Sequence, residues 1–149
     1  MRVGDIMVKD VKTVKADDSF ETASKILHEN GISSVVIKDN GNAAGIVTER
    51  DLVNLVADGA NPKQTKVGDR MTTDLATVES RSDIAEAARL MAERRIRHLP
   101  VVDRGKLVGM LSIRDLTQWA VEEMTGGHEL PDLERSHATL SAAVEAKKE

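Results

Sequence analysis

The sequence predicts an α/β fold of two β-α-β-β-α repeats in a pseudo-twofold arrangement, followed by a C-terminal helical tail. The first observation is that residues 3–7 (VGDIM) return as residues 67–71 (VGDRM), 64 positions later (3 to 67). The second is that residues 45–52 return as residues 109–116 at the same offset, without a gap. A period this long suits a small α/β subdomain better than a solenoid unit. Each copy of about 60 residues would be marginal alone, so we expect the copies to pack together.

Each repeat opens with a short strand, expected at residues 12–15 and 76–79, and an amphipathic helix. Asp18 offers an N-cap with Glu21 three residues later, which is the capping-box arrangement, and Ser82 takes the cap in the second copy. Apolar residues at helical spacing then follow in both copies: Phe20, Ala23 and Leu27, then Ile84, Ala87 and Met91.

A hairpin and a second helix complete each repeat. Apolar runs predict the two hairpin strands of each repeat: 35–37 and 43–47 in the first, and 99–102 and 107–111 in the second. Tight-turn signals with a central Gly, at 39–42 and 103–106, connect them. The final helices are expected to begin after Thr48 and Ser112.

These elements divide the chain into repeat 1 (residues 1–60), repeat 2 (65–124) and a tail (125–149). The tail is predicted to be helical, because apolar residues and one histidine recur at helical spacing: Leu133, His137, Leu140 and Val144. Either it covers an exposed edge of the fold, or it contacts a dimer mate or another protein. The repeat does not decide between these interpretations, since the tail lies outside it.

Composition excludes several classes of function. A net charge of −4 gives no general attraction to nucleic acid or to an anionic membrane. One Trp, one Phe and no Tyr offer no platform on which bases could stack, and zero Cys excludes thiolate chemistry. No apolar signal core begins the chain and no run is long enough to span a bilayer, so a cytoplasmic location is expected.

The residues with ligand-binding potential are Thr48-x-x-Asp51 and Ser112-x-x-Asp115, each where a strand ends and a helix begins. A helix N-terminus presents unpaired N–H groups and a positive dipole end, which favour phosphate, and a hydroxyl there adds a donor. A carboxylate one turn later can accept hydrogen bonds from the two vicinal hydroxyls of a ribose. Gly45 allows close backbone approach, as does its counterpart Gly109. Both motifs therefore fit a nucleoside monophosphate.

A structural interpretation competes with this one. Thr/Ser-x-x-Asp is close to a capping box, and such boxes are common. Two copies in register favour a binding site, but duplication could preserve a cap equally well, so both interpretations remain open here.

Arg97 and His98 begin a predicted strand whose end should face the cleft between the repeats. Guanidinium groups suit phosphate oxygens, and a solvated rim is the competing interpretation. If Arg97 and His98 bind phosphate, the two clefts are unequal. His28, His128 and His137 form no metal-ligand spacing, and neither a phosphate-binding glycine loop nor a nucleophile elbow is present. We therefore expect no metal, no cofactor, no catalytic residue and no enzyme.

These motifs closely resemble the cystathionine-β-synthase (CBS) domain family, as a stand-alone tandem pair or Bateman module. The matching features are the two Val-Gly-Asp-x-Met openings, residues 96–103 (IRHLPVVD) and the two Gly-h-h-Thr/Ser-x-x-Asp-Leu segments, and the resemblance covers about residues 2 to 122. It implies adenosine-type ligands in clefts shared by both copies, with AMP the favoured one. It also implies a homodimer, and a regulatory output through a separate protein partner or through the tail.

The resemblance also implies site residues. Asp51 and Asp115 would hold ribose hydroxyls, and Thr48 and Ser112 the phosphate. Further contributions come from both copies: Thr13, Ile32, Ser33 and Val36 for the Asp115 cleft, and Thr77, Ile96, Arg97 and Pro100 for the Asp51 cleft. Arg50, Arg114 and His98 are further phosphate contacts. Residues 33–36 (SSVV) replace the Arg-His-Leu-Pro of the second copy, which makes the wall facing Asp115 less typical.

Three functions remain in competition. The chain is a nucleotide sensor of the AMP, ADP or ATP type, a binder of S-adenosylmethionine, or a scaffolding dimer without ligand. The dimer interface is expected on the helices that follow the hairpins. Apolar residues there would supply the contact: Leu52, Leu55, Val56, Leu116 and Trp119.

Overall fold

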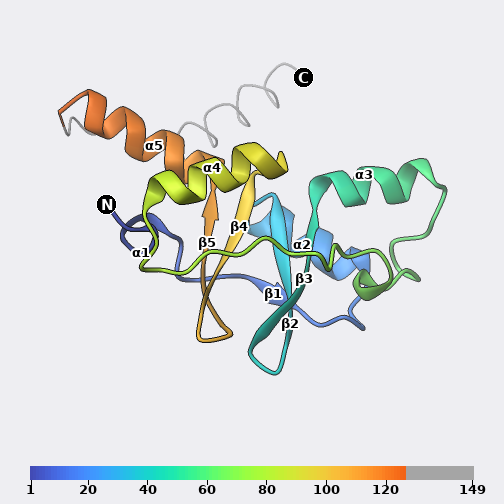
Figure 1. Cartoon of the computed structure of the whole chain (residues 1–149). Helices are drawn as coiled ribbons and strands as arrows, with labels where there is room; N and C mark the ends of the chain where they lie inside the picture. The colour runs from blue at the N-terminus through green and yellow to red at the C-terminus, as the bar shows by residue number, and fades with distance from the viewer. Residues whose placement is uncertain (127–149) are drawn as a thin grey trace, which may run out of the picture. The chain divides into compact units, whose positions relative to one another are not determined.

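The computed structural model describes residues 1–126 (Figure 1). These residues divide into two units, one of Met1–Ile113 and one that begins at Arg114. In order, the elements are α1 (Val3–Ile6), β1 (Thr13–Val14), α2 (Phe20–Asn30), β2 (Ser34–Asp39), β3 (Asn42–Thr48), α3 (Glu49–Ala57), the 3-10 helix η1 (Val67–Asp69), α4 (Ile84–Arg94), β4 (His98–Asp103), β5 (Lys106–Ser112) and α5 (Ile113–Met124). This order confirms the α/β fold class. No helix among residues 1–126 is long and apolar enough to cross a membrane.

The strands form one three-stranded sheet, β1-β2-β3, and one two-stranded sheet, β4-β5. β1 runs parallel to β2, whereas β2–β3 and β4–β5 are antiparallel hairpins whose turns lie at the same end of the first unit (Figure 1). Asn40 and Gly41 have φ values of 50° and 83°, and Arg104 and Gly105 have 50° and 79°. Two successive positive φ values are typical of a type I′ turn, as the turn signals predict.

The strand predicted at residues 76–79 is reduced to a single parallel bridge between Val78 and Val101. In repeat 1 the N–H of Val36 donates to the carbonyl of Lys12, at 3.4 Å. The equivalent residue of repeat 2 is Pro100, which has no N–H to donate. One ladder hydrogen bond is therefore lost, and the strand shortens.

The Val-Gly-Asp-x-Met segments are exchanged between the repeats. The N–H of Gly4 donates to the carbonyl of Ser80 (2.8 Å), and the N–H of Gly68 donates to the carbonyl of Ala16 (2.9 Å). These two contacts are equivalent under the 64-residue offset (4 to 68, 16 to 80). α1 therefore contacts repeat 2 while η1 contacts repeat 1, and this exchange joins the two copies within the first unit.

The two amphipathic helices each begin one residue later than predicted. Ser19 is the N-cap of α2 and accepts a hydrogen bond from the N–H of Thr22, while Asp83 caps α4 and accepts from the N–H of Ala85. Asp18 instead accepts from the N–H of Lys15, at 2.8 Å. A short polar side chain can satisfy either a turn or a helix N-terminus, so the pattern alone does not separate adjacent candidates.

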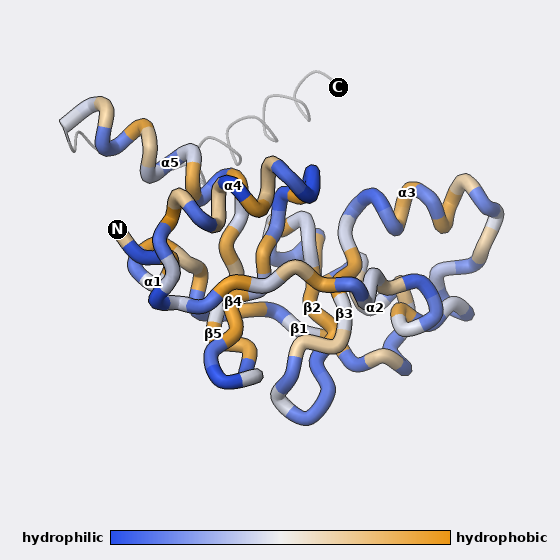
Figure 2. Tube along the Cα trace, viewed as in Figure 1, coloured by the Kyte–Doolittle hydropathy of each residue, from blue (hydrophilic) through white to orange (hydrophobic). Residues whose placement is uncertain are grey.

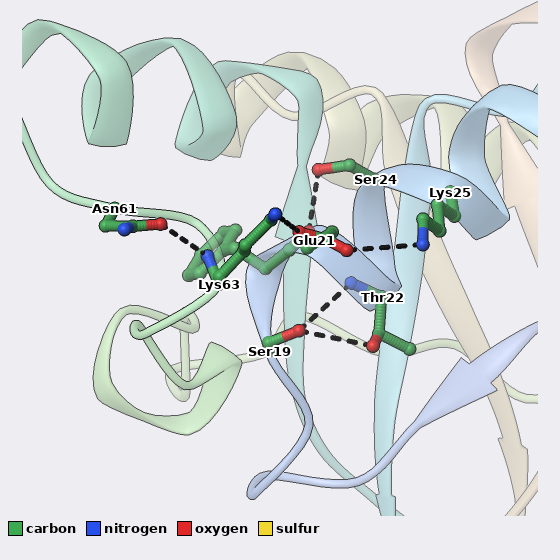
Figure 3. Close-up of polar contacts among 8 residues, drawn as sticks. Ser19, Glu21, Thr22, Ser24, Lys25, Asn61 and Lys63 are labelled. Atoms are coloured by element: carbon green, nitrogen blue, oxygen red, sulfur yellow. Dashed lines mark hydrogen bonds and ion pairs between the residues drawn. The ribbon is translucent and has the colours of Figure 1, made fainter.

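The linker between the repeats returns to the start of α2 (Figure 3). The N–H of Glu21 donates to the carbonyl of Pro62 at 3.1 Å, and the Glu21 carboxylate lies 4.0 Å from Nζ of Lys63 and 3.2 Å from Nζ of Lys25. The Asn61 side chain accepts from the N–H of Lys63 and thereby fixes the turn. The linker is thus held by backbone contacts, with exposed ion pairs that add little.

The core of repeat 1 lies between α2, α3 and the first sheet, where apolar residues follow the strands (Figure 2). Its fully buried side chains include Val35, Ile37 and Leu55, each at 0% exposure. The sequence predicted Leu55 at the dimer interface, and this is wrong, because Leu55 belongs to the core. Val56, which follows it, is 64% exposed.

Candidate functional site

The first candidate site is the junction between β3 and α3. Thr48 is the N-cap of α3 and Asp51 its third residue, and the two form a capping box. Oδ2 of Asp51 accepts from the backbone N–H of Thr48 at 2.7 Å and from the Thr48 hydroxyl at 3.3 Å. The structural interpretation of this motif is therefore correct for Asp51.

Capping does not exclude ligand binding by the same carboxylate. Both contacts to Thr48 use Oδ2, and the half-buried Asp51 side chain keeps Oδ1 outside them. The cap restricts the carboxylate to one orientation, which lowers the entropy lost when a ligand hydroxyl donates to it. The same residue can end a helix and offer a fixed acceptor.

Asp51 also lines a hollow of about 370 Å³ on one side of α3, together with Asn54, Ala57, Asp58 and Arg70. The hollow is open to solvent, and the other residues predicted for the Asp51 cleft, Thr77, Ile96, Arg97 and Pro100, are not among those that line it. Arg70 Nη1 and Asp58 Oδ2 form an ion pair at 2.7 Å. Asn54, Asp58 and Arg70 were not predicted from the sequence. Helical spacing from Asp51 (51, 54, 58) could have indicated the first two.

The second candidate junction lies between β5 and α5. Ser112 ends β5 and pairs with His98, as Thr48 pairs with Ser34 in the first repeat. Arg114 and Asp115 lie in the second unit, with Asp115 in the first turn of α5. The two junctions thus repeat the same strand-to-helix order.

The residues that immediately precede β2 and β4 are hydrogen-bonded to these two junctions. The carbonyl of Ser33 accepts from the N–H of Glu49 at 3.1 Å, and the carbonyl of Arg97 accepts from the N–H of Ile113 at 2.9 Å. Each first helical N–H therefore already has a partner, which reduces the number of donors available to a phosphate there. The Arg50 and Arg97 side chains are exposed.

The structure brings residues of the two repeats together at one place. Oγ of Ser33 and Nε2 of His98 are 2.7 Å apart and partly buried. Both residues were predicted as site residues, Ser33 in the Asp115 cleft and His98 as a phosphate contact, but no contact between them was predicted. Nothing in a periodic sequence indicates a pair separated by 65 positions rather than 64.

The remaining predicted site residues differ in accessibility. Thr13 pairs with Val36, which is completely buried, and Pro100 is also buried. Thr77 is exposed, and Ile32 and Ile96 are half-buried at equivalent positions after α2 and α4.

The two glycines of the repeated motif are approached by methionines. A Cβ at Gly45 would lie 2.5 Å from Sδ of Met71, and one at Gly109 would lie 2.5 Å from Sδ of Met7. The predicted close approach is therefore present. The approaching groups are side chains of the exchanged Val-Gly-Asp-x-Met segments, which gives these glycines a role in joining the repeats.

A polar contact between Ser80 and Asp103, specific to repeat 2, holds the residue to which α1 is hydrogen-bonded. Asp103 accepts from the Ser80 hydroxyl at 2.5 Å and from its N–H at 3.0 Å, while the Ser80 carbonyl binds Gly4. The Ser80 hydroxyl, followed by its N–H and by Arg81, lowers the pKa of Asp103 below its ordinary 3.8. Repeat 1 has Ala16 at the equivalent position, which carries no hydroxyl.

This contact predicts a pH dependence of stability. A depressed folded-state pKa contributes stability above the unfolded-state value, and this contribution is lost as pH falls through the folded-state value. The urea midpoint of the wild type should therefore fall more steeply on acidification below about pH 4 than that of Asp103→Asn. Asp39→Asn, at the equivalent position of repeat 1, should keep the wild-type slope. Equal slopes for Asp103→Asn and the wild type would contradict the assignment.

Among residues 1–126, no group of three or more His, Cys, Asp or Glu side chains could hold a metal ion. The arrangement is that of a paired α/β module whose two strand-to-helix junctions carry the same polar motif. The CBS domain profile matches residues 3–58 and 67–122, and the chain belongs to the CBS domain family as a tandem pair.

Solved structures support this assignment. A putative signal-transduction protein with CBS domains from Burkholderia ambifaria MC40-6 is 34% identical, with a TM-score of 0.77 over 88% of this chain and 98% of that one. The CBS domain pair of protein MJ0100 was solved in complex with 5′-methylthioadenosine and S-adenosyl-L-methionine. It is 26% identical, with a TM-score of 0.77 over 83% of this chain and 98% of that one.

Curated relatives give the same picture. The uncharacterized protein MK0525 of Methanopyrus kandleri is 38% identical over 119 residues, which are 78% of this chain and 61% of that protein. The CBS domain-containing protein YhcV of Bacillus subtilis is 27% identical over 138 residues, covering 93% of this chain and 97% of that protein. The chain therefore spans less than two thirds of the first relative and nearly all of the second.

Proposed function

We propose that this CBS pair is a regulatory module that binds an adenine nucleotide, with AMP as the favoured ligand, and that it acts through conformation or through a separate protein partner. The observation that carries the proposal is the Asp51 carboxylate, which its cap fixes beside a hollow of about 370 Å³. A carboxylate held in one orientation and accessible from an open hollow supports this proposal, because a ribose diol needs such an acceptor.

In this proposal the residues divide by chemistry. Asp51 and Asp115 accept from ribose hydroxyls, and Thr48 and Ser112 donate to phosphate. Arginines at and near the junctions supply the positive charge: Arg50, Arg97 and Arg114. Arg97 is exposed immediately before β4, and in this proposal it contacts the phosphate of the ligand.

S-Adenosylmethionine is a second candidate ligand. The MJ0100 pair holds S-adenosyl-L-methionine and 5′-methylthioadenosine, which share the adenosine group with AMP. The Asp51 contact to a ribose is common to both ligands. The cationic sulfonium and the phosphate differ in charge, so the exposed arginines favour the nucleotide.

Ligand binding is expected to raise the melting temperature. A ligand at 100 times its dissociation constant stabilises the native state by about 2.7 kcal/mol if it binds only that state. For a chain of this size the shift is several degrees. Thermal unfolding with millimolar AMP, ADP, ATP and S-adenosylmethionine measures this, with inosine as a base-altered control. No shift with any adenosine compound would leave the scaffolding dimer as the better interpretation.

We also expect the chain to form a homodimer through α3. Val53 and Val56 lie three residues apart on this helix and are 62% and 64% exposed, which favours contact with a second apolar surface. Light scattering at tens of micromolar should give a dimer for the wild type and a monomer for Val56→Asp. Val8→Asp is the matched control, since Val8 is 48% exposed and lies outside α3. A monomeric wild type would contradict the prediction.

A further inference from the structure

The hydrogen bond between Ser33 and His98 joins the two repeats immediately before their hairpins. Ser33 precedes β2 and His98 begins β4, and their side chains are 2.7 Å apart in a partly buried position. A partly buried hydrogen bond between polar side chains is less open to competition from water than an exposed one.

The backbone continues this contact to both candidate junctions. The carbonyl of Ser33 accepts from the N–H of Glu49, the first residue of α3, at 3.1 Å. On the other side, His98 follows Arg97, whose carbonyl accepts from the N–H of Ile113, the first residue of α5, at 2.9 Å. One side-chain hydrogen bond thus completes a path between the start of α3 and the start of α5.

The path breaks the symmetry of the duplication. Under the 64-residue offset, the counterparts of His98 and Ser33 are Ser34 and Arg97 (34 to 98, 33 to 97). Ser34 is 8% exposed and the Arg97 side chain is exposed, and within residues 1–126 no hydrogen bond joins their side chains. Among the residues that the structure describes, the connection is therefore made by one of the two equivalent pairs and not by the other.

We propose that Ser33 and His98 are positioning residues that couple the two strand-to-helix junctions, so that a displacement at one junction changes the stability of the other. Applied to ligands, this coupling rests on the proposed function: a nucleotide held at Thr48 and Asp51 would alter the start of α5, and a ligand at Ser112 would alter the start of α3. The hydrogen bond is a physical route for such communication between sites.

Amide hydrogen exchange on the full chain tests the coupling without any ligand. Loss of one net hydrogen bond should speed local opening roughly three- to tenfold. In Ser33→Ala the informative amide is Ile113, and in His98→Ala it is Glu49, because each belongs to the repeat that was not altered. Faster exchange at these amides in both variants is the expected result. Ser33→Thr keeps the hydroxyl and should restore the Ile113 rate to within about twofold of the wild type.

Ser24→Ala is the matched control. Oγ of Ser24 donates to the carbonyl of Phe20 at 2.7 Å in a partly buried position, so this hydrogen bond lies within α2 of repeat 1 (Figure 3). It should leave both informative amides unchanged. An unchanged Ile113 rate in Ser33→Ala would overturn the proposal. A rise that is equal at Ile113 and at the core amide of Val35 would also overturn it, because that result indicates global loss of stability.

A second arm adds saturating AMP and separates this inference from the proposed function. In the wild type AMP should slow exchange at both Glu49 and Ile113. The Asp115→Asn variant impairs the second junction. In that variant AMP should still slow exchange at the Ile113 amide. Adding Ser33→Ala to it should abolish this effect. If AMP changes no amide in the wild type, the proposed ligand is wrong, while the ligand-free comparison still decides the coupling.

Discussion

Asp51→Asn is expected to weaken nucleotide binding roughly ten- to a hundredfold, since a hydrogen bond to a charged acceptor contributes about 1.5–3 kcal/mol. Asparagine retains one oxygen that can accept from the N–H of Thr48, as Oδ2 of Asp51 does at 2.7 Å. Its second atom on the amide becomes an NH₂ group, which cannot accept from a ribose hydroxyl. The variant therefore separates capping from ligand binding. Isothermal titration with AMP gives the affinity, and urea unfolding gives the stability.

The control for this variant is Asp58→Asn. Asp58 lines the same hollow and carries the same charge, but its carboxylate is paired with Arg70. Removing the charge of Asp58 should change the AMP affinity less than threefold, which is less than about 0.7 kcal/mol. If Asp51→Asn unfolds at lower urea yet binds AMP as well as the wild type, the capping role accounts for the motif alone. Asp115→Asn should repeat the Asp51 result at the second junction.

Sequence periodicity predicted the backbone of this protein well because the duplication is without gaps. A single offset placed both hairpins, both turns and both strand-to-helix junctions in register. Apolar runs such as residues 35–37 (VVI) are strong signals, since they satisfy a strand buried on both faces. The exchange of the Val-Gly-Asp-x-Met segments was not predicted. Those segments are short, and their partners lie in the other repeat.

The differences between sequence and structure each have a local physical cause. Pro100 shortens a strand because it lacks an N–H, although its place in the repeat predicts an equivalent ladder. The N-caps of α2 and α4 are Ser19 and Asp83, and the sequence predicted Asp18 and Ser82. Adjacent polar residues compete for the same backbone donors. The contact between Ser33 and His98 joins positions that the repeat does not relate, so periodicity could not reveal it.

The helical face of α3 was the least predictable part of the candidate surfaces. Leu52, Leu55 and Val56 are all apolar, and the sequence analysis predicted all three at one dimer interface. The structure separates them: Leu52 packs partly buried against the core, Leu55 is buried within it, and Val56 is exposed. Adjacent helical residues point about 100° apart, so one can enter the core while the next faces solvent.

Leu55→Ala is therefore expected to destabilise the fold by about 2–5 kcal/mol, which is the range for a buried leucine that leaves a cavity. Leu55 is 0% exposed and belongs to the cluster formed by Phe20, Leu27 and Val35. Val56→Ala, one residue away and 64% exposed in the single chain, should change the free energy of unfolding of the monomer by less than about 0.5 kcal/mol. Urea unfolding at several protein concentrations measures both and separates folding from dimer dissociation. If Val56→Ala cost as much as Leu55→Ala at every concentration, the assignment of Leu55 to the core and Val56 to the surface would be wrong.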